Sequence, residues 1–341
     1  MSIYLTFILT FVLGFGLTYF GVHYFRLYSI AKNWLDVPNE RSSHTSPTPR
    51  GGGIVIVAIC LMGYTLLALF GELDFVWGYF IGALLIAIVS WLDDLYSLSF
   101  VWRLCIQLLS ASLLIYSIAP SLYDSFATSI YSGGAIAISI IGIVWIVNAY
   151  NFMDGIDGIA GLQAGVAAAS WALLTWSFAV GLSIYSMLVF AAAIGFLFHN
   201  WSPARVFMGD VGSAFLGFTF ASLPFLSLNF YRSDTHLLPI FAILTLWPFI
   251  FDTAFTLITR ILKRQRIWQA HREHLYQRLV KQGYSHLSTA SLYGTFAFIT
   301  SAAAFSLISG LTGPMAVSVT LVAVSIGFAL FVLSTSRVAH S

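Results

Sequence analysis

Charged side chains are scarce in this chain. Lys, Arg, Asp and Glu make up 8% of the 341 residues, whereas 59% are hydrophobic and the mean hydropathy is +0.89. A water-soluble domain could not cover so much apolar surface. The scarcity excludes a soluble globular protein and predicts several membrane-spanning helices, because a helix of roughly 20 residues satisfies its own backbone hydrogen bonds in hydrocarbon.

Cysteine is almost absent as well. Cys60 and Cys105 both lie in apolar segments, which excludes a disulfide framework and a cysteine metal site. The net charge of +2 gives no reason to expect a nucleic-acid partner, because membrane topology and lipid headgroups account for the basic residues. Since no long polar domain or internal repeat is present, residues 1–341 are predicted to form a single membrane-embedded domain.

Long apolar segments dominate the chain instead. They predict an all-α, polytopic bundle of about eleven transmembrane helices in the lipid bilayer. The first segment lacks a small-residue cleavage site, so we expect it to be retained rather than removed as a signal peptide. The expected spans are residues 3–23, 51–70, 76–92, 104–120, 134–150, 162–179, 182–199, 212–230, 237–258, 288–309 and 315–334.

The basic residues divide unequally between the two sides of such a bundle. If the N-terminus faces outward, only Arg232 of the 15 lysines and arginines falls on the outer side. Cytoplasmic loops preferentially keep basic residues. We therefore expect an outward N-terminus, a cytoplasmic C-terminus and an active site on the inner loops, at residues 24–50, 93–103, 148–161, 200–212 and 259–287.

Five aspartates lie at or beside helix ends on that inner side. An acid at bilayer depth costs roughly 2.5 to 3.5 kcal/mol, so such acids tend to be functional or paired. Each one alone is equally explained as a helix cap. Together they would repel one another unless a hard divalent cation lay among them, and Mg²⁺ fits best, with Mn²⁺ as a substitute. The five are Asp93, Asp94, Asp154, Asp157 and Asp210.

The segment NAYNFMDGIDGIAG, residues 148–161, is the most specific motif. Asn148, Asn151 and Asp154 are spaced three apart and would line one polar helical face, beside glycines that leave the backbone bare. This pattern suits close approach of a nucleotide or diphosphate. Further along, FMGDVGS places Asp210 between glycines just before a new span, as expected for a metal ligand near a helix N-terminus that attracts anions.

Basic groups are expected to complete the site, because phosphoryl transfer needs positive charge against the phosphates. Arginine suits bidentate phosphate contacts, and histidine can donate a hydrogen bond near neutral pH. The candidates are Arg50, Arg103 and, in the HREH cluster, His271, Arg272 and His274. Asp252, inside the ninth expected span, stays open between pairing with a cation and shaping the site.

Other functions are compatible with parts of this pattern. A secondary transporter also has many spans and intramembrane acids, although it would place charges near mid-bilayer; it is kept as the alternative. An alcohol phosphatidyltransferase would need Ala-Arg after its acid-glycine motif, whereas DGIDG continues as IAGLQAG. An intramembrane aspartyl protease would need Gly-x-Gly-Asp, and position 207 is Phe207.

Taken in order, the motifs PNERSSHTSPTPRGGG, DDLYS, NAYNFMDGIDGIAG, FMGDVGS and HREHLYQRL are similar to those of one family. Over nearly its whole length the chain resembles the polyprenyl-phosphate N-acetylhexosamine-1-phosphate transferase superfamily, glycosyltransferase family 4. HREH replaces the run of adjacent histidines found in the branch acting on muramyl-pentapeptide, so the chain resembles instead the bacterial initiators of O-antigen, teichoic-acid and related envelope glycans. DDLYS departs from the family in lacking a nearby lysine, and Arg103 stands where members place a basic residue after the acid pair.

The resemblance implies a magnesium-dependent enzyme of the bacterial inner membrane that transfers N-acetylhexosamine-1-phosphate from a UDP-sugar to undecaprenyl phosphate and releases UMP. The predicted catalytic residues are Asp93, Asp94, Asp210, His271 and His274. The predicted substrate contacts are Asn148, Asn151, Asp154, Asp157, Arg103, Arg272 and Arg50, and the predicted metal ligands are Asp210, Asn151 and Asp93. The donor sugar stays open, as does the oligomeric state, with a homodimer among the alternatives.

Overall fold

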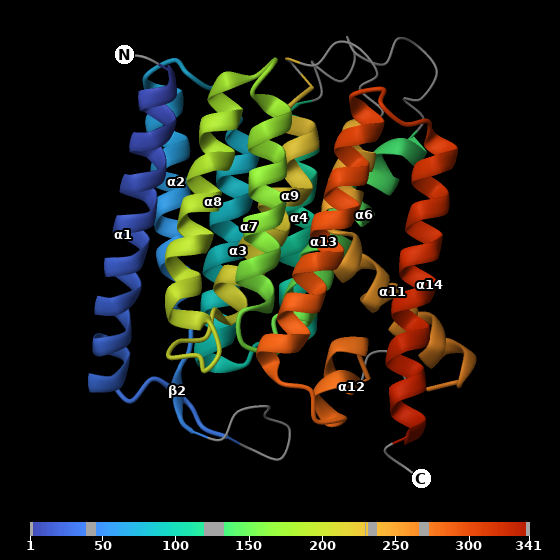
Figure 1. Ribbon diagram of the computed structural model, residues 1–341. Coiled ribbons are helices and arrows are strands. Elements are labelled where there is room, and N and C mark those ends of the chain that lie inside the picture. Colours follow the sequence, from blue (N-terminus) through green and yellow to red (C-terminus); the bar gives the residue numbers. More distant parts are fainter. Residues whose placement is uncertain are drawn as a thin grey trace.

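Helices make up nearly all of the structure, which is a computed structural model that describes residues 3–38, 46–118, 133–228, 230, 237–265 and 273–338. The predicted all-α class is confirmed. The helices run side by side as a bundle, and a pair of two-residue strands lies at one end of it (Figure 1). The elements are α1 (Ile3–Ala31), β1 (Leu35–Asp36), β2 (Thr48–Pro49), α2 (Gly53–Leu69), α3 (Trp77–Tyr96), α4 (Phe100–Ser117), α6 (Gly133–Met153), α7 (Ile159–Thr175), α8 (Val180–Asn200), α9 (Gly209–Leu226), α10 (Leu237–Thr245), α11 (Trp247–Leu262), α12 (Leu275–Lys281), α13 (His286–Ile308) and α14 (Pro314–Val338).

Each of the eleven apolar segments contains helix, but not all of these helices are long enough to cross a membrane by themselves. Among the described residues, 8 helices are long and apolar enough, and the number rises to 9 if α10 and α11 form one bent span. The helices α2 and α7 have 17 residues each and are shorter. The chain is thus a multi-pass membrane protein.

A sharp bend separates α10 from α11. The two helices meet at 78°, with Leu246 between them and Pro248 in the first turn of α11. Proline has no N–H to donate, and its ring collides with the carbonyl of Leu244, so a straight helix cannot continue through this point. The bend places the buried residue Asp252 in the half of the broken span that leads toward α12.

The centre of the bundle is α9, whereas α1 and α14 lie at its two edges (Figure 1). Glycines allow α2 to approach α9 closely. A Cβ placed on Gly53 would lie 2.4 Å from the Cα of Gly212. The two backbones therefore touch where α9 begins.

The chain before α2 is fixed to the loop before α9. β1 and β2 pair antiparallel, and Arg50 then forms a parallel bridge with Phe207. The N–H groups of Gly51 and Gly52 donate to the Phe207 carbonyl at 3.1 and 3.0 Å, and Phe207 donates to the Pro49 carbonyl at 2.8 Å. These backbone bonds place Arg50 beside the first turn of α9.

Candidate active site

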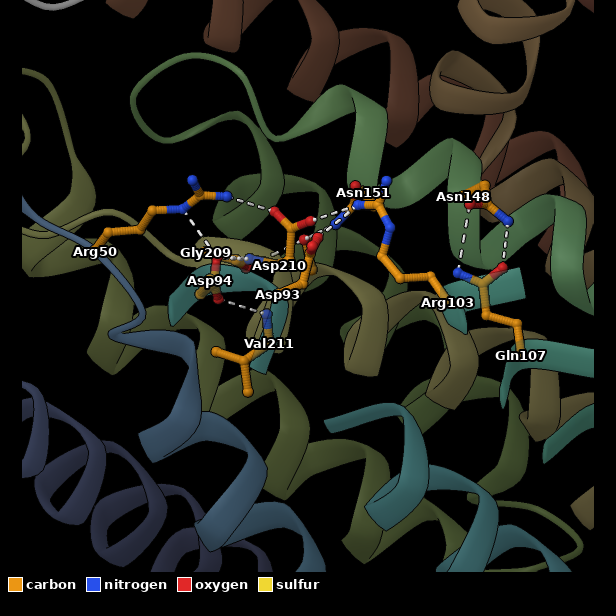
Figure 2. Close-up of polar contacts among 11 residues, drawn as sticks. Arg50, Asp93, Asp94, Arg103, Gln107, Asn148, Asn151, Gly209, Asp210 and Val211 are labelled. Carbon is orange, nitrogen blue, oxygen red and sulfur yellow. Dashed lines mark hydrogen bonds and ion pairs between the residues drawn. The ribbon is translucent and has the colours of Figure 1, made fainter. Parts of the chain in front are cut away.

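Arg50 joins two of the predicted acids at one end of the bundle. Its Nε lies 2.9 Å from Asp94 Oδ1, and its second terminal nitrogen lies 2.7 Å from Asp210 Oδ1 (Figure 2). Burial by itself lowers the pKa of Arg50, but the charges of Asp210, Asp94 and Asp36 outweigh it, and the pKa is raised. Arg50 therefore stays charged and links helix α3 with helix α9, because it pairs with Asp94 of α3 and with Asp210 of α9.

Asp94 also caps the N-terminus of α9. Its carboxylate accepts hydrogen bonds from the backbone N–H groups of Asp210 at 3.0 Å and Val211 at 3.1 Å. Gly209 makes this approach possible: its φ is +75°, and a Cβ there would lie 2.7 Å from Asp94 Oδ2. A carboxylate at a helix N-terminus is stabilised by the free N–H groups and the helix dipole. Asp94 is thus engaged on every side by groups of the protein.

Arg103 makes the second bridge of the cluster. Its guanidinium lies 2.6 Å from Asp93 Oδ2 and 3.3 Å from Asp210 Oδ2. Asp210 therefore lies between two arginines, one on each carboxylate oxygen, as Figure 2 shows. The structure brings together Asp93, Asp94, Asp210, Arg50 and Arg103, which are five of the predicted site residues.

Amide side chains extend the cluster along α6. Asn151 donates to the Ser213 hydroxyl at 3.0 Å, so it lies against the first turns of α9. Asn148 and Gln107 exchange two hydrogen bonds, at 2.6 and 3.4 Å, between α6 and α4 (Figure 2). Sequence reasoning missed Gln107, although a glutamine inside an apolar span, one turn after Arg103, is itself a signal.

Asp154 follows directly after α6 and faces the negative charge of the cluster. Burial raises its pKa to about 7, with Asp210 and Asp94 adding to the rise and Arg50 opposing it. Among the described residues, no hydrogen bond or ion pair to its carboxylate is found. Asp154 therefore has room for a further partner, and a positive one would be favoured.

Among the described residues, Asp157 makes no hydrogen bond or ion pair with the cluster, although it lies only three residues after Asp154. Its Oδ2 lies 3.2 Å from His286 Nδ1, at the start of α13, and accepts from the Ala204 N–H at 3.1 Å. Burial alone raises its pKa, but His286 and the backbone donor outweigh this, and the pKa is lowered. These contacts suit a carboxylate that ties loops together.

The predicted basic loop is only partly described. His271 and Arg272 lie outside the described residues. His274 is buried, and its Nδ1 lies 3.1 Å from Oδ1 of Asp252, which is part of α11. The sequence left the role of Asp252 open, and its histidine partner was not anticipated.

The oxygen donors of the cluster fit a hard cation such as Mg²⁺ by their chemistry. In the described part of the chain, no three His, Cys, Asp or Glu side chains already stand in a metal-binding arrangement. The two arginines occupy the oxygens of Asp210 instead. The three carboxylates of Asp93, Asp94 and Asp210, when ionised, carry one negative charge more than the two arginines balance.

The fold and the site define a class of protein: a multi-pass helical membrane protein with a cluster of aspartates and arginines at the helix ends. The comparisons narrow it further. Residues 76–228 match the model of the family described as glycosyl transferase family 4. That segment runs from α3 to α9 and contains the three acids of the cluster and Arg103. With the relatives described next, the match shows that the chain belongs to glycosyl transferase family 4 and is a transferase.

Three relatives illustrate the family. The chain is 33% identical over 278 residues, 80% of this chain and 77% of the other, to a probable undecaprenyl-phosphate N-acetylglucosaminyl 1-phosphate transferase of Bacillus subtilis (strain 168). It is 29% identical over 314 residues (79% and 74%) to the decaprenyl-phosphate N-acetylglucosaminephosphotransferase of Mycolicibacterium smegmatis. It is 27% identical over 271 residues (74% and 70%) to the undecaprenyl-phosphate alpha-N-acetylglucosaminyl 1-phosphate transferase of Escherichia coli (strain K12).

Proposed function

We propose that this protein transfers N-acetylhexosamine-1-phosphate from a UDP-sugar to undecaprenyl phosphate, as the first step of O-antigen or related envelope glycan synthesis. The single observation that carries the proposal is the Asp93, Asp94 and Asp210 cluster, bridged by Arg50 and Arg103 at the helix ends. Three relatives named as N-acetylglucosamine phosphate transferases support the sugar class. A secondary transporter is less well supported, because these acids lie at one end of the bundle.

The arginines have the chemistry to receive the phosphates of a donor. Arg50 is about two-fifths exposed, with 41% of its side chain accessible, and Arg103 is 30% exposed. Each therefore has guanidinium surface left for phosphate oxygens, which arginine binds in a bidentate manner. We place the diphosphate beside these two arginines, with Asn148, Asn151 and Asp154 along its far side.

Mg²⁺, with Mn²⁺ as a substitute, is proposed as the cofactor, held by Asp210 with help from Asn151 and Asp93. A divalent cation there would offset charge on the diphosphate and on the leaving UMP. The negative surroundings of Asp154 support a cation in this region. Asp94 is less suited than Asp210 as a ligand, because three donors hold its oxygens and its side chain is only 4% exposed, whereas Asp210 contacts the two arginines and is 18% exposed.

The proposed step is a displacement at phosphorus. A phosphate oxygen of undecaprenyl phosphate forms a bond to the sugar-bearing phosphorus, and the bond from that phosphorus to the oxygen of UMP breaks. The sugar's own carbon–oxygen bond is untouched, so its anomeric configuration is retained. The attacking phosphate loses its second proton near pH 6, so no strong base is needed, and Asp93 can position the phosphate or take the last proton.

We further propose that α2, α7 and the bent pair α10 and α11 also cross the membrane, which gives eleven spans. An odd number agrees with α1 beginning at one end of the bundle and α14 finishing at the other (Figure 1). The positive-inside rule then places the site end at the cytoplasmic face of the bacterial inner membrane.

The test uses the purified enzyme with Mg²⁺, a short polyprenyl phosphate and a panel of UDP-N-acetylhexosamines, read by mass spectrometry. We expect a lipid diphosphate sugar and UMP in equal amounts, and we expect Asp210→Asn to abolish both. Asp74→Asn is the matched control, because Asp74 is exposed at the other end of the bundle. Absence of product with every donor would overturn the function, and an active Asp210→Asn enzyme would remove Asp210 as a metal ligand.

A further inference from the structure

Asp252 is wholly buried in α11, and its carboxylate accepts hydrogen bonds from its own helix and from two other parts of the chain. Oδ1 accepts from Thr256 at 3.1 Å, on the same helix, and lies 3.1 Å from His274 Nδ1. The backbone N–H groups of Leu275 and Tyr276 donate to its two oxygens at 2.9 and 3.2 Å.

The Tyr293 hydroxyl of α13 also donates to Asp252. A buried carboxylate is costly unless its oxygens are satisfied. Here the donors come from α11, the start of α12 and α13. Asp252 therefore fixes the point where these three helices meet.

The next link runs from α12 to the segment that carries Asp154. The Tyr276 hydroxyl donates to the Phe152 carbonyl at 3.1 Å. Gly155 lies directly against the same ring, since a Cβ placed there would lie 2.0 Å from the Tyr276 oxygen. Tyr276 thus contacts the chain on both sides of Asp154, the acid that faces the Asp210 cluster.

We propose that Asp252 is a positioning residue for the transfer reaction, which fixes His274 and α12 and, through Tyr276, the backbone around Asp154. The inference rests on the proposed function, because it concerns how that site is held. The contact of Asp252 with His274 Nδ1 orients the imidazole ring of His274. Outer-shell partners of metal-ligating histidines typically change affinity or activity about 10- to 100-fold when removed, and we expect an effect of the same order for the carboxylate that orients His274.

The main test compares Asp252→Asn with Thr253→Val in detergent or nanodiscs. Asparagine keeps the shape but presents an NH₂ group to the N–H donors of Leu275 or Tyr276, which undocks α12. Thr253 is the neighbouring matched control, since among the described residues its hydroxyl donates only to the carbonyls of Phe249 and Ile250 in its own helix. We expect kcat/KM per folded enzyme to fall about 10- to 100-fold in the first variant and to stay at the wild-type value in the second.

A second readout does not depend on activity. Arg278 lies inside α12, so trypsin cleaves after it only when α12 leaves the bundle. We expect cleavage at Arg278 to be about tenfold faster in Asp252→Asn and unchanged in Thr253→Val. If the wild-type enzyme transferred no sugar phosphate, the proposed function would fail, yet the protease rates would still decide whether Asp252 docks α12.

A double-mutant cycle separates positioning from a general loss of stability. If Asp252 acts through His274, then the double variant Asp252→Asn, His274→Ala loses little more kcat/KM than the worse single variant.

Two milder variants keep the test open if Asp252→Asn does not fold. Tyr293→Phe and Thr256→Val each remove one hydrogen-bond donor to Asp252, and we expect smaller losses of kcat/KM in each. Wild-type kcat/KM and protease rates in all folded variants, or additive losses in the cycle, would overturn the proposal.

Discussion

Asp154 and Asp157 lie three residues apart, yet their carboxylates have opposite surroundings. Burial, together with the neighbouring acids, raises the pKa of Asp154 to about 7. Asp157 lies beside His286 and the Ala204 N–H, which outweigh its burial and lower its pKa. The same motif therefore supplies one acid to the cluster and another to the loop contacts. Spacing alone could not separate these two roles.

The first prediction at this scale concerns Asp157 and pH. Its folded pKa is lowered below the unfolded value of about 3.9, so the ionised form stabilises the fold above that pH. This contribution disappears as the pH falls through the folded pKa. We expect Asp157→Asn to lower the melting midpoint in detergent at pH 7, and the gap from wild type to close below about pH 4.

Asp74→Asn is again the control, since its side chain is exposed. A melting midpoint equal to wild type at pH 7 would contradict the loop-tying role of Asp157. A gap that widened in acid would have the wrong sign for a carboxylate with a lowered pKa.

At the scale of the element, the start of α9 depends on close backbone contact. Gly53 of α2 and Gly212 of α9 touch, and Gly209 leaves room for the Asp94 cap. Any Cβ at this crossing would push α2 away from α9. Arg50, three residues before the start of α2, would then move away from Asp210.

We therefore predict that Gly212→Ala lowers both the melting midpoint and the transfer rate. A Cβ at Gly212 would lie 2.5 Å from Met208 Cγ and 2.7 Å from the Cα of Gly53, and the second contact is backbone that cannot move aside. Gly142→Ala on α6 is the matched control, because nothing lies within 4 Å of its added Cβ. Alanine there favours the helix by up to about 1 kcal/mol.

Thermal unfolding in detergent and the UDP-sugar assay measure the two variants side by side. If Gly212→Ala behaved like Gly142→Ala, the close approach of α2 and α9 would not matter for the site.

At the scale of the whole molecule, the bundle has a site end and an opposite end. Ser99, before α4, lies near Arg103 in the chain, and Ser177, between α7 and α8, lies at the other end; both are exposed. With Cys105 changed to serine and Cys60 left buried, a cysteine introduced at either position can be labelled selectively.

We expect an impermeant maleimide to label Ser99→Cys only in inside-out vesicles and Ser177→Cys only in right-side-out vesicles. The reversed pattern would place the site outside the cell, where UDP-sugars are absent, and would contradict both the positive-inside assignment and the proposed reaction. Labelling of both positions from the same side would contradict the assignment that α4, α6 and α7 all cross the membrane.

The sequence by itself determined where the apolar helices lie, because each needs a continuous run of apolar residues that is visible locally. It also determined that Asp93, Asp94 and Asp210 lie at helix ends, since charges are rare enough in this chain to stand out. The length of each helix depends also on contacts with distant parts of the chain. For this reason α2 and α7 are shorter than the spans expected from the sequence, and the ninth expected span is bent into α10 and α11.

Only the tertiary structure decided which groups meet. Arg50 contacts Asp210, which lies 160 positions away in the chain. The Nδ1 atom of His274 contacts Asp252 and not the acid cluster. Such pairs depend on how helices cross and on where glycine lets two backbones touch, and neither is encoded in any short segment. For the same reason Gln107 was overlooked, although its partner Asn148 was predicted.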